Sequence, residues 1–179
     1  QYDIGAKEIG WARRNKKAGD MSSGGWGATG SGLGGARKRG IGMANGNWYV
    51  FASENTSAQV KVHRDGSVEV VAGYQDIGTG SRTAIAAVAA EELGVETSAV
   101  TMRIGDTQFP QGPASGGSVT VNSVAPAVRL AANEARTKLF ALAAPLVGVA
   151  AEDLEAANGT IFVAKDKTKS ITFKQAAAK

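Results

Sequence analysis

The sequence has no cysteine and a single histidine among its 179 residues. The lack of cysteine excludes disulfide bonds, iron–sulfur ligation and thiolate chemistry within this chain. Long hydrophobic runs are also missing, because no apolar stretch approaches the roughly 20 residues that a membrane-spanning helix needs. We therefore expect no membrane span. The composition fits a cytoplasmic and a periplasmic setting equally well.

Aromatic residues are scarce at 6%, whereas glycine is abundant at 24 residues and apolar residues reach 43%. This apolar content is ordinary for a globular protein and argues against wholesale disorder. The chain is long enough for one domain with a genuine core. Because large rings are few while glycine and alanine are many, we expect close backbone approaches to build that core.

The formal charge is +4 and the calculated pI is about 9.4, which would permit a nucleic-acid partner. The positive charge is concentrated in residues 13–39 and in a tail with Lys165, Lys167 and Lys169. No aromatic residues interleave with these in an RNA-binding pattern, so we predict no nucleic-acid partner. The basic residues of 13–39 form either a solvated loop, which we favour, or a docking surface for a partner subunit.

The composition changes over residues 15–40 to glycine, serine, lysine and arginine, with nothing to bury. We predict a surface loop there. It divides the chain into an N-terminal segment with its Gly/basic-rich loop, 1–38, and a domain, 39–179. Residues 30–35 match the dinucleotide-binding pattern G-x-G-x-x-G, but the match is weak because no strand precedes it and no helical pattern follows.

Two segments with period-two alternation, 58–63 and 67–70, are separated by Arg64-Asp65-Gly66. Such a turn between alternating segments is typical of a tight β-hairpin. His63 falls on the polar side of its strand, and a lone exposed histidine there indicates a structural role. Residues 40–52 are expected to form a further extended segment, which we count as the first of three strands.

Two glycine-flanked loops that contain hydroxyl residues each lead into an apolar helical pattern. The first loop spans 76–83. The second spans 116–120 and leads to a longer helix that should begin near Ser123. Pro126 would then lie in the first turn, where proline is tolerated, and Pro145 should stop or kink the helix.

Further strands are predicted at 99–104, 160–163 and 170–173, with a short helical piece at 152–157. The order of these elements indicates an α+β fold. We expect a two-layer α/β sandwich, in which a mixed sheet with a β-hairpin carries two main helices on one face. Both helix-opening loops would then lie at one edge of that sheet.

The two loops together favour a ligand with more than one anionic or polar end. A loop that opens a helix presents backbone N–H groups without intrahelical partners, and the positive end of the helix dipole attracts an anion. Glycine at 78, 80, 116 and 117 removes the Cβ atoms that would keep a ligand away from the backbone. The alternative is that both loops are ordinary turns with Ser/Thr caps.

Six short motifs follow one another along the chain, and together they resemble a known family. They are Arg39-Gly-Ile-Gly-Met-Ala44, Asp65-Gly66-Ser67-Val68, Asp76-Ile-Gly-Thr-Gly80 with Thr83, Ala89-Ala-Glu-Glu-Leu-Gly94, Gly105-Asp106-Thr107, and Gly116-Gly117-Ser118 through Ala127-Val128. In their order and spacing the chain resembles the molybdenum-cofactor-binding (large) subunit of the xanthine dehydrogenase/aldehyde oxidase family, the molybdenum hydroxylases. The resemblance runs from about residue 1 to the end.

This resemblance implies a bound molybdopterin with molybdenum, in bacteria usually the cytosine dinucleotide form. It also implies hydroxylation of an aldehyde or N-heterocycle with oxygen taken from water. Family members often have glutamine where Thr79 stands, so the side chain reaches less far here. The implied cofactor-binding residues are Gly78, Thr79 and Gly80 in the first loop, and Gly116, Gly117, Ser118, Val119 and Thr120 in the second.

The resemblance places the family's catalytic glutamate after residue 179, so we expect no catalytic and no metal-ligating residue in this fragment. Glu91, Glu92 and Asp106 are interpreted as a helix face and a strand-end turn. The expected partners are the remainder of the molybdenum subunit, iron–sulfur and flavin or cytochrome subunits, and a small-molecule substrate. The isolated chain is expected to be inactive.

A second hypothesis is a non-catalytic binding or interaction module that kept the same fold and no longer holds the cofactor. Molybdenum analysis and pterin fluorescence of the intact parent protein would separate the two hypotheses. With either, we expect the bacterial cytoplasm or periplasm, and we favour the cytoplasm.

Overall fold

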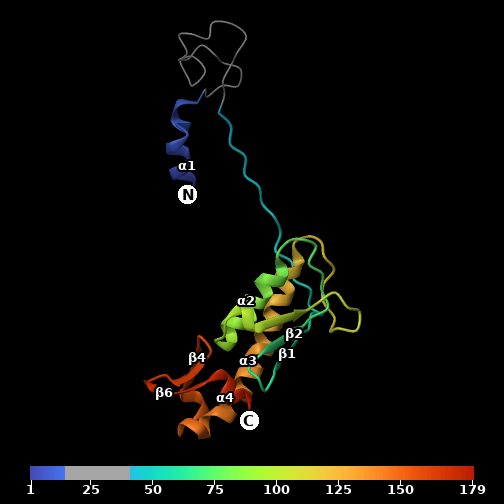
Figure 1. Ribbon diagram of the computed structural model, residues 1–179. Coiled ribbons are helices and arrows are strands. Elements are labelled where there is room, and N and C mark those ends of the chain that lie inside the picture. The colour runs from blue at the N-terminus through green and yellow to red at the C-terminus, as the bar shows by residue number, and fades with distance from the viewer. Residues whose placement is uncertain (15–40) are drawn as a thin grey trace. The chain divides into compact units, whose positions relative to one another are not determined.

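The computed structural model describes residues 1–14 and 41–179 (Figure 1). The chain forms two compact units, Gln1–Trp48 and Tyr49–Lys179. In the first unit, helix α1 spans Tyr2–Glu8 and a 3-10 helix follows at Trp11–Arg13. The predicted loop at 15–40, with its G-x-G-x-x-G match and most of its basic residues, lies outside the described residues.

The second unit opens with the predicted β-hairpin. Strand β1 spans Gln59–Val62 and strand β2 spans Val68–Val71, and the two pair antiparallel. His63 N–H donates to the Ser67 carbonyl at 2.9 Å, and Asp65 Oδ1 accepts from the Ser67 N–H at 2.9 Å. Gly66 has a φ of +86°, which glycine adopts without steric cost. The hairpin prediction is therefore confirmed.

Strand β3, Val100–Arg103, pairs parallel with β2 and completes a three-stranded sheet in the order β1-β2-β3. Helices α2, Ser81–Leu93, and α3, Val119–Val147, pack side by side on this sheet. A mixed sheet with a hairpin and two main helices on one face was predicted, and this α+β arrangement is confirmed.

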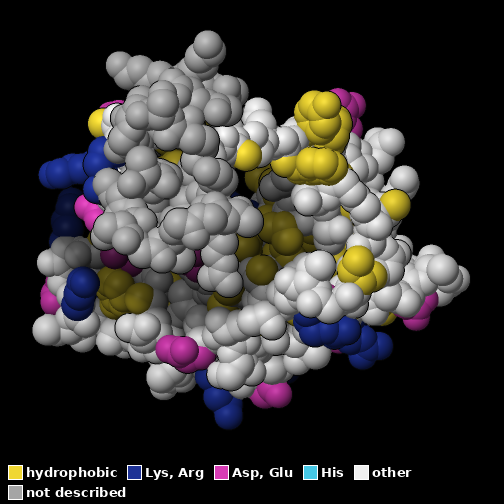
Figure 2. Space-filling model, turned by 90° about the horizontal axis from the view of Figure 1, so that it is seen from above, with side chains coloured by type: hydrophobic (Ala, Val, Ile, Leu, Met, Phe, Trp, Pro, Cys, Tyr) yellow, Lys and Arg dark blue, Asp and Glu magenta, His cyan; other side chains and the backbone are white. Residues whose placement is uncertain are grey.

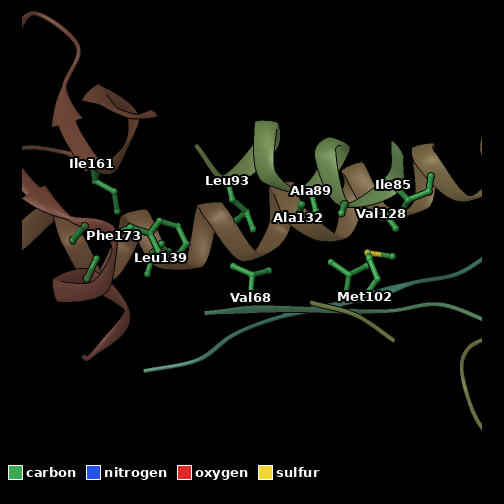
Figure 3. Packing of buried hydrophobic residues seen from close by; sticks show 14 of the residues in the cluster. Val68, Ile85, Ala89, Leu93, Met102, Val128, Ala132, Leu139, Ile161 and Phe173 are labelled. Atoms are coloured by element: carbon green, nitrogen blue, oxygen red, sulfur yellow. The ribbon is translucent and has the colours of Figure 1, made fainter. Parts of the chain in front are cut away.

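The core lies between the two helices and the sheet. Figure 3 shows Ile85 beside Val128 and Ala89 beside Ala132 on the two helices, with Met102 reaching up from the sheet. Both alanines are fully buried, and their small side chains let the helices approach closely. Removing an aliphatic side chain of the size of Ile85 from water contributes about 1.5–3 kcal/mol to folding.

A second, antiparallel sheet follows α3. Strands β4 Leu154–Ala157, β5 Thr160–Val163 and β6 Asp166–Thr172 form it in that order, and helix α4 spans Phe173–Ala177. A Cβ atom at Gly94, just past α2, would lie 2.4 Å from the carbonyl carbon of Ala156. Glycine therefore permits the close approach of β4 to the end of α2.

Helix α3 differs from its predicted extent. It begins at Val119 instead of near Ser123 and continues through both Pro126 and Pro145. Each proline leaves the carbonyl four residues earlier without its helical donor. Those carbonyls belong to Asn122 and Ala141, which are both exposed, so water can satisfy them.

Two further predictions were wrong. Residues 152–157 form a 3-10 helix, Ala151–Asp153, and then β4, because Leu154 and Ala156 pair with Val163 and Ile161 of β5. The segment expected to be extended at 40–52 forms no strand in its described part, 41–52. A strand exists only where another strand pairs with its backbone, and none among the described residues pairs with this segment.

Candidate functional site

The two predicted loops lie at the same end of the second unit. Parallel strands β2 and β3 end at Val71 and Arg103, and the chain runs from these two ends into the loops that open α2 and α3. Ile85 of α2 lies beside Val128 of α3, and Glu92 further along α2 contacts Arg136 further along α3, so the two helices run in the same direction (Figure 3). Figure 1 shows both helices beginning at the same end of this unit.

The first loop is closed around a carboxylate of its own. Asp76 Oδ1 accepts from the backbone N–H groups of Gly78, Thr79 and Gly80 at 2.9, 3.0 and 3.3 Å. Its Oδ2 accepts from the backbone N–H of Arg82 at 2.9 Å. These backbone hydrogen bonds, led by the one from Arg82, hold the pKa of Asp76 below its ordinary value. Sequence reasoning grouped Asp76 with the loop but missed this role.

Glycine is required in the first loop by backbone conformation. Gly78 and Gly80 have φ angles of +99° and +77°, and a Cβ atom at either position would meet nothing within 4 Å. Thr79 between them is exposed, and its hydroxyl lies 3.4 Å from Asp76 Oδ1. The loop therefore leaves open space beside its two glycines, while three of its amides and the Thr79 hydroxyl point toward Asp76.

Beneath the first loop lies a buried tyrosine. The Tyr74 hydroxyl donates to the carbonyl of Ser81 at 3.4 Å. Burial, with a smaller contribution from the negative charge of Asp76, raises the pKa of Tyr74 to about 12. Tyr74 is therefore neutral near pH 7 and supports the first turn of α2 from below.

The second loop has no such internal carboxylate. Gly117 and Ser118 both have a φ of +60°, and the Val119 N–H donates to the Gly116 carbonyl at 3.2 Å. Within the described part of the chain, the Ser118 side chain makes no capping hydrogen bond at the start of α3. A Cβ atom at Gly116 or Gly117 would meet nothing within 4 Å. Neither glycine is therefore required here by a close approach of neighbouring atoms to its Cα.

Ser123 ties the start of α3 to the chain that precedes β1. Its hydroxyl donates to the Val119 carbonyl at 2.7 Å and accepts from the Ser53 N–H at 2.8 Å. The guanidinium of Arg82 makes a comparable link for α2, donating to the Met102 carbonyl of β3 at 3.0 Å. Neither link could be found from the sequence, because each joins residues at least 20 positions apart.

A cavity of about 290 Å³ lies between the segments that follow β2 and β3. Gly73 and Gln111 form a parallel bridge there, and a Cβ atom at Gly73 would lie 2.2 Å from the Pro110 carbonyl oxygen.

Asp106 Oδ1 accepts from the Gln108 N–H at 2.8 Å, which confirms Asp106 as a strand-end turn residue.

The described residues contain neither a metal-binding cluster nor a membrane-spanning helix. No group of three or more His, Cys, Asp or Glu side chains in residues 1–14 and 41–179 is arranged to hold a metal ion. In the same residues, no helix has both the length and the apolar character needed to span a membrane.

Comparison with known families identifies the chain. A family model described as the molybdopterin cofactor-binding domain matches residues 5–179. The chain belongs to this family. Both loops, 76–83 and 116–120, fall within the match.

Sequence relatives of this molybdopterin cofactor-binding domain are enzyme subunits. The chain is 32% identical over 174 residues to the aldehyde oxidoreductase molybdenum-binding subunit PaoC of Escherichia coli, which covers 97% of this chain and 21% of that subunit. It is 37% identical over 112 residues to one of the subunits of nicotinate dehydrogenase from Pseudomonas putida, covering 62% of this chain and 9% of that one. The chain therefore spans only a small part of the curated relatives that it matches.

Solved structures agree. Quinoline 2-oxidoreductase from Pseudomonas putida 86 superposes with a TM-score of 0.65 and 28% identity, covering 69% of this chain and 16% of that one. CO dehydrogenase from Oligotropha carboxidovorans gives a TM-score of 0.63 and 29% identity, covering 69% and 15%. The fold of the molybdopterin cofactor-binding domain is thus found within quinoline 2-oxidoreductase and CO dehydrogenase.

Proposed function

We propose that this chain is part of the molybdopterin-binding subunit of a molybdenum hydroxylase, which oxidises an aldehyde or N-heterocycle with water-derived oxygen. Residues 39–179 form the cofactor-binding domain in this proposal. One observation carries it: in a chain of this family, two glycine-bounded helix starts open at the same end of the sheet.

The residues present fit a pterin nucleotide. The second loop, Gly116, Gly117, Ser118, Val119 and Thr120, opens a helix of 29 residues, and the positive end of a helix dipole suits a phosphate. The first loop, Gly78, Thr79 and Gly80, has an exposed Thr79 side chain and open space beside both glycines. We assign the anionic end of the ligand to the second loop, because Asp76 already fills the amides of the first.

When bound, the molybdenum cofactor supplies the redox chemistry of the hydroxylation. This chain supplies part of the cradle and neither the catalytic base nor a metal ligand. Glu92 and Asp106 are committed to an interhelical ion pair and to a turn, respectively, which supports this assignment. The isolated chain is accordingly predicted to be inactive.

Other parts of the enzyme are assigned to other chains or segments. We propose the cytosine dinucleotide form of the cofactor, and flavin or cytochrome on partner subunits. Iron–sulfur clusters are also assigned to partner subunits, because this chain has no cysteine to ligate them. The remainder of the molybdenum subunit would cover apolar side chains that are exposed in this chain, such as Val50 at 84% and Leu130 at 68%. Figure 2 shows hydrophobic side chains at the surface on one face. A bacterial cytoplasmic location is favoured over the periplasm.

The sharpest test is Gly116→Val in the full-length subunit. Gly116 lacks a positive φ and a Cβ atom there meets nothing within 4 Å, so valine adds bulk to the ligand space without backbone strain. We expect cofactor retention at least about tenfold weaker, the factor given by about 1.4 kcal/mol of lost binding. Molybdenum analysis and pterin fluorescence measure it, with circular dichroism as the check on folding.

Gly46→Val is the matched control. Gly46 also lacks a positive φ and has open space, but it belongs to the first unit and to neither loop. It should leave the molybdenum content unchanged. Full molybdenum content in Gly116→Val would contradict the placement of the site. A well-folded wild-type subunit without molybdenum would favour a non-catalytic binding module with the same fold.

A further inference from the structure

The sequence contains two Asn-Gly pairs, and the same residue type precedes both. Asn45-Gly46 follows Ala44, and Asn158-Gly159 follows Ala157. Asparagine before glycine is prone to spontaneous deamidation, because glycine has no Cβ atom to keep its backbone nitrogen away from the asparagine side chain. The local sequence therefore gives both asparagines a similar reactivity, and a large difference between them has to come from the fold.

Deamidation requires the backbone nitrogen of the following residue to reach the side chain. This nitrogen attacks Cγ of the asparagine, the N–Cγ bond forms, and the Cγ–Nδ2 bond breaks. Ammonia leaves with the proton that the nitrogen has lost. Water then opens the cyclic imide at either carbonyl and gives aspartate or isoaspartate. A backbone N–H that donates to a carbonyl keeps its proton and its position, so it reacts only after the segment opens.

The fold holds both peptide groups of the glycine after Asn158. Asn158 and Gly159 have φ angles of +51° and +73°, which is typical of a two-residue type I′ turn, and they connect β4 to β5. The Gly159 N–H donates to the Gly94 carbonyl at 2.8 Å, and the Gly159 carbonyl accepts from the Phe173 N–H at 2.8 Å. The turn is thus fastened to the end of α2 and to the start of α4, and its nitrogen is committed.

The glycine after Asn45 has no such restraint. Both Asn45 and Gly46 are exposed, in a segment that forms no strand. Within residues 1–14 and 41–179 the Gly46 N–H makes no hydrogen bond, and a Cβ atom at Gly46 would meet nothing within 4 Å. The Tyr2 hydroxyl donates to Asn45 Oδ1 at 2.9 Å. A donor to this oxygen polarises the carbon that the nitrogen attacks, so the hydrogen bond favours the reaction.

We propose that Asn45 is a site of spontaneous deamidation, with water as the second reactant, and that the fold protects Asn158 from the same reaction. The product has one more carboxylate, so the formal net charge falls by one unit from +4. Isoaspartate also lengthens the main chain by one methylene group, directly after the Arg39-Gly-Ile-Gly-Met-Ala44 motif. This inference does not depend on the proposed function.

The test is mass spectrometry of proteolytic peptides from the 179-residue chain after incubation near neutral pH. In the folded chain, Asn45 should deamidate at least about tenfold faster than Asn158. In concentrated urea the two rates should become similar, because the local sequence is then the only influence. Equal rates in the folded chain would overturn the proposal. A difference that persisted unchanged in urea would overturn the protection by the fold.

Gly46→Ala is the matched variant. Gly46 lacks a positive φ and has open space, so alanine adds a Cβ atom without backbone strain. It should slow deamidation at Asn45 at least about tenfold and leave the rate at Asn158 unchanged. An unchanged rate at Asn45 would exclude attack by the nitrogen of residue 46.

Amide hydrogen exchange of the wild-type chain gives a second, independent readout. The Gly159 N–H should exchange at least about tenfold more slowly than the Gly46 N–H, because only the Gly159 N–H has a backbone acceptor among the described residues. Equal exchange of the two amides would show that the hydrogen bond to Gly94 does not protect Asn158, and would overturn this part of the proposal.

Discussion

Two buried serines lie near the starts of the two long helices, and only one of them has hydrogen-bond partners for its hydroxyl among the described residues. Ser81, the first residue of α2, is 2% exposed, and its hydroxyl has no partner among the described residues. Ser123 of α3 is 5% exposed and makes two hydrogen bonds, to Val119 and Ser53. A buried hydroxyl without a partner is destabilising, whereas a satisfied one contributes to stability.

We predict that Ser81→Ala raises the free energy of unfolding by about 0.5–1 kcal/mol, because it removes an unpaired buried hydroxyl and improves helix propensity. Ser123→Ala should lower it by about 1–3 kcal/mol, because the Ser53 N–H loses its acceptor. Urea unfolding followed by circular dichroism measures both. Destabilisation by the two variants to the same extent would contradict the difference in hydrogen bonding.

Helices α2 and α3 are joined by a charged cluster around Glu92. Glu92 is 11% exposed and lies 3.0 Å from Arg136 Nη2 and 3.3 Å from Arg129 Nε. Asn133 Nδ2 donates to it at 2.9 Å, and Arg136 also donates to the Glu92 carbonyl at 3.0 Å. These contacts fix the two helices against each other, and with them the two loops at their N-termini.

Glu92→Gln should lower the free energy of unfolding by about 1–2 kcal/mol, because the two arginines lose their charged partner in a half-enclosed site. The control is Glu91→Gln, which changes a neighbouring exposed glutamate with no ion pair among the described residues. It should change stability by less than about 0.5 kcal/mol. Thermal and urea unfolding of both variants decide the point, and equal effects would exclude a special role for Glu92.

For the whole molecule, the shifted pKa values set the pH range of stability. Hydrogen bonds lower the pKa of Asp65, Asp76, Glu92 and Asp166 from ordinary values of 3.8 for aspartate and 4.5 for glutamate. A lowered folded-state pKa stabilises the protein above the unfolded-state value, and this contribution is lost as the pH falls. Tyr74 behaves in the opposite way, because its pKa is raised to about 12.

We therefore predict full stability between about pH 5 and pH 9, a loss below about pH 4, and a second loss as the pH rises from about 10 to 12. Thermal unfolding at a series of pH values measures both limbs. Tyr74→Phe should flatten the alkaline limb and leave the acid limb unchanged. If the alkaline limb kept its slope in this variant, the loss of stability at high pH would come from groups other than Tyr74.

Much of the fold could be predicted from local patterns. The alternation around Arg64-Asp65-Gly66 predicted the hairpin, and the apolar spacing from Ile85 to Leu93 predicted α2. The prediction failed at residues 152–157, where the pairing of β4 with β5 overrode a helical pattern, and at Pro126, which lies in the interior of α3. Each failure depended on a partner or on solvent exposure that the local sequence does not record.

By itself, the sequence determined the hairpin, the two helices, the glycine loops that open them and membership of the family. Those features depend on residues close together in the chain or on motif order. The folded chain was needed to see that Asp76 fills the first loop, that Ser123 holds residue 53, and that Glu92 joins α2 to α3. Each of these contacts joins residues that are far apart in the sequence. A hydrogen bond forms only between groups that the packing of the chain brings within about 3 Å of each other, and the local sequence does not record this distance.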